Sequence, residues 1–180
     1  MFKIFFIFIS LSSPNLQSPA DLSWGEKADR APIIENFTHW YGSVNSSIIY
    51  ANRKNIDGIE TELQLYYSNR ALTSATLFLG PTGIGPSNCT DIYSNIISAL
   101  NEKYGKLIYK KEIIDPVGND LVFNSTCRKV LVGVNQYAAY WTYKNIKIEA
   151  WLYGDGEDII IAIDYIFKKD KELKNLKNIF

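Results

Sequence analysis

Between residues 90 and 104, apolar side chains recur with the spacing of one helical turn. Ile92, Ile96 and Leu100 are four residues apart, and Tyr93 and Ile97 widen the same apolar stripe. Polar residues such as Asn95, Asn101 and Glu102 fall mostly elsewhere. This spacing predicts an amphipathic helix with one buried face. Gly105 follows directly, and glycine readily adopts the left-handed conformation that ends many helices.

Apolar and polar residues alternate in the segments on both sides of this helix, and such alternation is the pattern of half-buried strands. Before the helix, it predicts a strand at residues 48 to 53 and a hairpin at residues 59 to 79. After the helix, it predicts a strand at residues 136 to 143 and a hairpin at residues 146 to 167. The second hairpin turns at Gly154-Asp155-Gly156-Glu157, which is favourable turn chemistry.

These elements predict the α+β class, with an antiparallel sheet packed by helices. A weaker helical pattern at residues 27 to 37 makes the order helix, strand, strand, strand occur twice, in halves at 21 to 80 and 86 to 167. Either a duplication produced two tandem helix-plus-three-strand meander units, or a common pattern recurs by chance. The second half is longer because of the segment 107 to 132, and residues 168 to 180 form a lysine-rich basic tail or short helix.

Residues 1 to 20 have the features of a secretory signal peptide. Lys3 supplies a positive end, residues 4 to 11 an apolar run, and the small residues before Ala20 a cleavage site. We expect residues 21 to 180 to form a single domain, secreted or periplasmic after cleavage near Ala20. The apolar run is shorter than the roughly 20 residues that cross a bilayer, so no stable membrane span is predicted.

The two cysteines, Cys89 and Cys127, lie in the predicted mature chain. An even number of cysteines in an exported chain favours a disulfide, which would connect the segment 107 to 132 to the start of the second helix. A catalytic or metal-binding cysteine is the weaker alternative, because His39 is the single histidine. No metal site and no cofactor is predicted.

The balance of charge excludes some function classes. The 180 residues include 19 basic and 19 acidic side chains, so the clustered basic surface that binds nucleic acid is not expected. A nucleophilic triad needs an oriented base, and nothing in the sequence beyond His39 suggests one. The carboxylates of Asp155, Glu157 and Asp164 leave a carboxylate-dependent hydrolase open, although Asp155-Gly156 is explained by the turn.

Aromatic residues recur along the two strands at 136 to 143 and 146 to 153. The candidate binding residues are Tyr137, Trp141, Tyr143, Trp151 and Tyr153. Aromatic rings often anchor protein interfaces, so the two strands could present an aromatic sheet surface. The alternative is that the rings fill a second layer of the core.

The helix ending Glu102-Lys103-Tyr104-Gly105, followed by strands with spaced tryptophans, resembles a pattern in many small exported bacterial proteins. A duplicated topology would also resemble beta-lactamase-inhibitor-like proteins and outer-membrane-assembly lipoproteins, although the lipid-modified cysteine of the lipoproteins is missing here. This resemblance implies a binding module. We therefore expect an exported non-catalytic protein that binds an envelope or extracellular protein through a sheet surface; the alternatives are a carrier of a small apolar or aromatic ligand and the hydrolase.

Overall fold

The computed structural model describes residues 23–25, 47–56, 58–69, 71–80, 83–114 and 125–168. The predicted signal peptide, the predicted helix at residues 27 to 37 and the C-terminal residues 169 to 180 lie outside these ranges. Within them, no helix is both long and apolar enough to cross a membrane.

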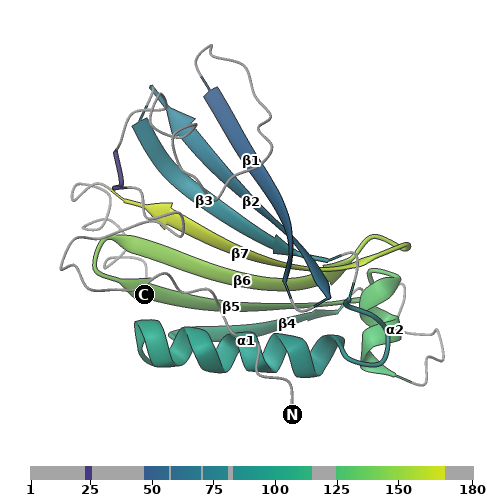
Figure 1. The fold of residues 1–180 in the computed structure, drawn as a ribbon. Coiled ribbons are helices and arrows are strands. Elements are labelled where there is room, and N and C mark those ends of the chain that lie inside the picture. Colours follow the sequence, from purple (N-terminus) through teal and green to yellow (C-terminus); the bar gives the residue numbers. More distant parts are fainter. Residues whose placement is uncertain are drawn as a thin grey trace.

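Seven strands and two helices form this part of the chain (Figure 1). In chain order they are β1 (Ser47–Ile56), β2 (Ile59–Ser68), β3 (Ala71–Leu79), α1 (Cys89–Tyr104), β4 (Tyr109–Ile114), α2 (Thr126–Leu131), β5 (Asn135–Tyr143), β6 (Ile146–Gly154) and β7 (Ile159–Phe167). The predicted α+β class, both predicted hairpins and the central helix are confirmed.

All seven strands belong to one antiparallel sheet in the order β1-β2-β3-β7-β6-β5-β4. Two three-stranded meanders, β1 to β3 and β5 to β7, join where β3 pairs with β7. The sheet is strongly twisted, so that β1 rises steeply in Figure 1 while β4 lies nearly along α1. The meanders match the predicted strand order, and a duplication stays a prediction because residues 27 to 37 are not described.

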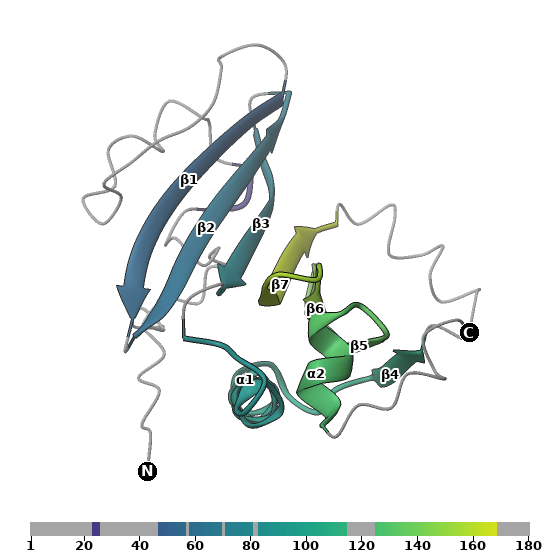
Figure 2. The same ribbon diagram turned by 90° about the vertical axis from the view of Figure 1, so that its right-hand side faces the viewer.

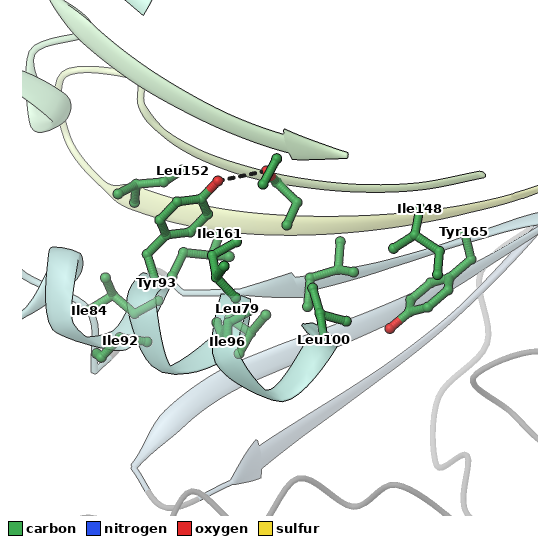
Figure 3. Packing of buried hydrophobic residues seen from close by; sticks show 14 of the residues in the cluster. Leu79, Ile84, Ile92, Tyr93, Ile96, Leu100, Ile148, Leu152, Ile161 and Tyr165 are labelled. Carbon is green, nitrogen blue, oxygen red and sulfur yellow. Dashed lines mark hydrogen bonds between the residues drawn. The ribbon is translucent and has the colours of Figure 1, made fainter. Parts of the chain in front are cut away.

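Both helices pack on the same side of the sheet, which we call the helix face (Figure 2). Ile96 and Leu100 of α1 are fully buried against the sheet, and the Tyr93 hydroxyl donates a 2.9 Å hydrogen bond to the carbonyl of Ala150 in β6 (Figure 3). The aliphatic positions of β6 and β7 complete this core: Ile146, Ile148, Leu152, Ile159, Ile161 and Ile163. Burial of these side chains is the main stabilising contribution of the helix face.

The segment 107 to 132 contains two elements that the sequence pattern did not predict. All of the residues of β4 except Ile113 are exposed, so this strand has no alternation of buried and exposed positions. The six residues of α2 are too few to show a helical repeat. Ser125 precedes α2 as its N-cap, and its hydroxyl accepts a hydrogen bond from the backbone amide of Arg128.

The predicted disulfide is confirmed, because Cys89 at the start of α1 is bonded to Cys127 in α2 with 5.8 Å between the Cα atoms. Both cysteines are buried in the core. At its other end, α2 approaches β6 so closely that a Cβ atom at Gly154 would lie 2.3 Å from the carbonyl oxygen of Val130. Glycine is therefore required at residue 154, and α2 is fixed at both ends.

Replacing both cysteines with alanine should lower the free energy of unfolding by about 4 kcal/mol, because the disulfide restricts the unfolded chain. Urea unfolding of the oxidised protein and of the Cys89→Ala/Cys127→Ala variant measures this difference. Reduced wild-type protein is the control, and it should unfold together with the variant. Equal midpoints for oxidised protein and variant would show that the disulfide contributes no stability.

Candidate functional site

The sheet face that points away from α1 and α2, which we call the open face, carries a row of polar and aromatic residues. The strand register places one residue from each of six strands directly opposite the next. This central row consists of Gln64, Thr76, Asp164, Glu149, Tyr140 and Tyr109. Directly opposed side chains on one face of a sheet are close enough to interact. Each side chain of the row can therefore interact with its neighbours in the row.

Two carboxylates lie side by side in the middle of this row. Asp164 of β7 is directly opposite Glu149 of β6, an arrangement that is unfavourable for two like charges. Burial raises the pKa of Asp164, and the charge of Glu149 raises it further, whereas a 2.6 Å hydrogen bond from the Thr76 hydroxyl and the charge of Lys147 act in the opposite direction. The net shift is upward, so the ionised form of Asp164 destabilises the folded state.

Glu149 is held by two neighbours on its own strand. Its carboxylate forms an ion pair with Lys147 and accepts a 3.2 Å hydrogen bond from the indole nitrogen of Trp151. The Lys147 ammonium also lies 5.8 Å from the centre of the Tyr140 ring, within the range of a cation–π interaction. The geometry of this site therefore accommodates a cation between a carboxylate and an aromatic ring.

Aromatic rings border the carboxylates on the β5 side. Trp151 meets Tyr140 edge to face with 6.0 Å between ring centres, and Tyr140 lies 5.8 Å from Tyr109 of β4. Trp151 and Tyr140 are partly exposed. Aromatic pairs of this kind add stability beyond the area that they bury, so the rings form a fixed platform.

Polar groups border the carboxylates on the β2 side. The Tyr66 hydroxyl donates a 2.5 Å hydrogen bond to Gln64, whose amide nitrogen donates one of the same length to Glu62. Burial raises the pKa of Tyr66 and of Tyr153, and the charge of Asp164 raises both further. Both phenols are therefore neutral at physiological pH and keep their hydrogen-bond donors.

The structure divides the five candidate aromatic residues between the two faces of the sheet. Trp151 and Tyr153 lie on the open face. Tyr137, Trp141 and Tyr143 lie on the helix face, because Tyr137 is opposite Leu152, Trp141 opposite Ile148, and Tyr143 opposite Ile146. The five residues thus do not form one surface.

On the helix face, Trp141 is 1% exposed, and its indole nitrogen donates a 3.0 Å hydrogen bond to Asn101 of α1. Tyr137 donates a 2.7 Å hydrogen bond to Glu112 of β4. Tyr143 packs edge to face on Tyr104 with 5.6 Å between ring centres. These three rings attach α1 and β4 to the second meander.

The sequence pattern missed Tyr140 because it did not show which residues of β5 share a sheet face with Glu149 and Trp151 of β6. Lys144 and Asn145 alone separate Tyr143 from its partner Ile146, so odd residues of β5 face even residues of β6. A two-residue hairpin loop fixes this register. Applying that rule to the sequence would have placed Tyr140 beside Glu149 and Trp151.

The carboxylates suggested for a hydrolase are not brought together. Asp155 accepts backbone hydrogen bonds of 3.0 and 2.8 Å from Glu157 and Asp158, and these bonds lower its pKa. Asp164 lies five residues into the strand that begins at Ile159, a distance of about 16 Å along an extended chain. Asp155 therefore stabilises the turn, and the pair that the fold creates is Glu149 with Asp164.

No protein-family model, no curated protein and no solved structure matches the chain. Within the described ranges, no group of three or more histidine, cysteine, aspartate or glutamate side chains could hold a metal ion.

Replacing Trp141 with alanine should cost about 3–5 kcal/mol of stability, because a fully buried side chain is lost from the core. Replacing Trp151 should cost less, about 1 kcal/mol, because this ring stays partly exposed in the folded state. Urea unfolding of the two variants provides the comparison. Equal losses would contradict the assignment of the two tryptophans to different environments.

Replacing Asp164 with asparagine should stabilise the protein at neutral pH, because it removes a charge that burial and Glu149 disfavour. When folding raises the pKa of an aspartate, the protein loses stability as the pH increases. The loss begins near the pKa of the unfolded state, about 3.9, and continues through the pKa of the folded state. The advantage of Asp164→Asn should therefore be small at pH 3 and grow towards pH 7. Unfolding free energies at both pH values test this, and a constant difference would contradict it.

Proposed function

We propose that this protein is an exported, non-catalytic binding module that docks an envelope or extracellular protein on the open face of its sheet. The observation that carries the proposal is the juxtaposition of Glu149 and Asp164 with the partly exposed rings of Trp151 and Tyr140. Rigid aromatic rings next to specific polar groups are typical of interface anchors.

The energetic cost of Asp164 supports this proposal. The folded state would be more stable with a neutral group at residue 164, since the pKa of Asp164 is raised by burial and by Glu149. Groups that reduce stability without a packing benefit are often found at functional sites. A binding role explains why a carboxylate lies in the middle of this face.

The chemistry of the face favours a lysine or arginine side chain from the partner. Lys147 already places its ammonium against Glu149 and over the Tyr140 ring. A second cation from a partner would find Asp164 and the Trp151 ring on the other side of Glu149. Carboxylates and aromatic faces both attract a cation, and these attractions strengthen as water is excluded.

An extracellular or periplasmic location is supported by the buried Cys89–Cys127 disulfide and by the predicted signal peptide. Stable structural disulfides are typical of oxidising compartments. The partner is therefore sought in the cell envelope and in the surrounding medium.

Site-specific photo-cross-linking tests the proposal. The full chain is produced with a photoreactive amino acid at Tyr153 on the open face, or at the exposed Val132 after α2 as the matched control. Each oxidised protein is then incubated with envelope and medium fractions of its source. We expect one protein to be cross-linked from residue 153 and not from residue 132.

Asp164→Asn is the decisive variant in this experiment, because it should weaken cross-linking at least tenfold while stabilising the fold. Trp151→Ala should weaken it similarly, and Val132→Ala should leave it unchanged. Cross-linking that is insensitive to Asp164→Asn and Trp151→Ala would overturn the proposal. A small molecule that copurifies with the folded protein, detected by native mass spectrometry, would instead favour the ligand carrier.

A further inference from the structure

The β4 strand lies at one end of the sheet (Figure 2), and large apolar side chains in the strand and directly before it are exposed. Ile108 is 67% exposed, Tyr109 53% and Ile114 47%, the largest exposed fractions among the large hydrophobic residues of the described chain. Within the described ranges, β4 pairs with β5 and with no other strand. An exposed edge strand offers backbone amide and carbonyl groups to a further strand.

A second copy of β4 is complementary to this edge. Two identical edge strands can pair antiparallel about a two-fold axis. Facing residues point to the same side of a sheet, so the open faces of both copies lie on one side only when two facing residues are both odd-numbered or both even-numbered. One residue of the strand must therefore face its own copy, with the axis passing between the two. Each choice of that residue gives a different set of cross-strand pairs.

The register centred on Lys111 matches each apolar residue with an apolar residue. Ile108 then faces Ile114 of the second copy, and Tyr109 faces Ile113. Lys110 faces Glu112 of the second copy, so two ion pairs form. The single unfavourable contact is Lys111 with its own copy, and both of these lysines are exposed and can turn toward solvent.

The neighbouring registers are poorly matched. Centring on Glu112 places lysines opposite Ile113 and Ile114 and brings the two Glu112 carboxylates together. Centring on Lys110 places Ile108 opposite Glu112. Charged residues at a sheet edge normally prevent unspecific pairing, and here they favour the register centred on Lys111 over its two neighbours.

Hydrogen bonds from residues of β5 hold the Glu112 side chain in an orientation that suits this register. Its carboxylate accepts hydrogen bonds of 2.7 Å from the Tyr137 hydroxyl and 3.0 Å from the Asn135 amide. These bonds restrict the side chain to the helix face, which is the face that Lys110 of the second copy would share by strand alternation.

From this complementarity we propose that the protein forms a two-fold symmetric dimer in which β4 pairs with β4 of a second copy, centred on Lys111. Two seven-stranded sheets then become one continuous sheet, with both open faces on the same side. The contact is short, so the dimer dissociates on dilution. This inference rests on the sheet edge and is independent of the function proposed for the open face.

Cysteine cross-linking of the full chain tests the register. Lys111→Cys places two cysteines directly opposite, about 4.5–5.5 Å apart at their Cα atoms, which suits a disulfide. We expect this variant to form at least tenfold more covalent dimer than Lys110→Cys or Glu112→Cys alone. A mixture of Lys110→Cys with Glu112→Cys should cross-link efficiently, because those two residues face each other.

Charge reversal separates a lost interface from a damaged fold. Sedimentation of the wild type should show a reversible monomer–dimer equilibrium, and Lys110→Glu or Glu112→Lys should each weaken it at least tenfold. Mixing the two variants should restore dimerisation, since each like-charge pair becomes an opposite-charge pair. A wild type that stays monomeric at high concentration, or equal cross-linking from residues 110, 111 and 112, would overturn the proposal.

Discussion

Burial of the helix face under α1 is the constraint on which the rest of the structure depends. The apolar stripe of α1, with Ile96 and Leu100 fully buried, requires an aliphatic surface, and alternate residues of β6 and β7 supply it. Because side chains alternate along a strand, fixing one face also fixes the other. The positions of Glu149, Trp151 and Asp164 on the open face therefore follow from the packing of the core on the opposite side.

Stability and the proposed binding function make opposite demands on the central row. On the helix face, the polar atoms of two large rings are paired within the fold, because Trp141 donates to Asn101 and Tyr137 donates to Glu112. On the open face, Asp164 lies opposite Glu149 although a neutral residue would suit the fold better. Polar groups of the core are thus paired as stability requires, whereas like charges are placed together on the face where a partner is expected. This difference points to the open face as the functional one without any known relative.

The sequence predicted those elements whose burial repeats regularly. The helix at residues 90 to 104 and both hairpins were found because apolar residues recur at periods of about four or two. The disulfide followed from two cysteines in a chain that was predicted to be exported. β4 was missed because nearly all its side chains are exposed. The faces of Trp141 and Trp151 depend on the register between strands, which periodicity within one strand does not contain.

The acid pair lies at the place where the two halves of the sheet meet. Thr76 belongs to β3, the last strand of the first meander, and its hydroxyl donates to Asp164 of β7, the last strand of the second. Glu149 and the rings of Trp151 and Tyr140 come from the second meander alone. The aromatic platform is therefore local to one hairpin and its neighbour, whereas the surroundings of Asp164 involve both meanders, since Thr76 of β3 binds and orients that carboxylate. A separated second meander would keep the rings and lose the support that makes the carboxylate pair specific.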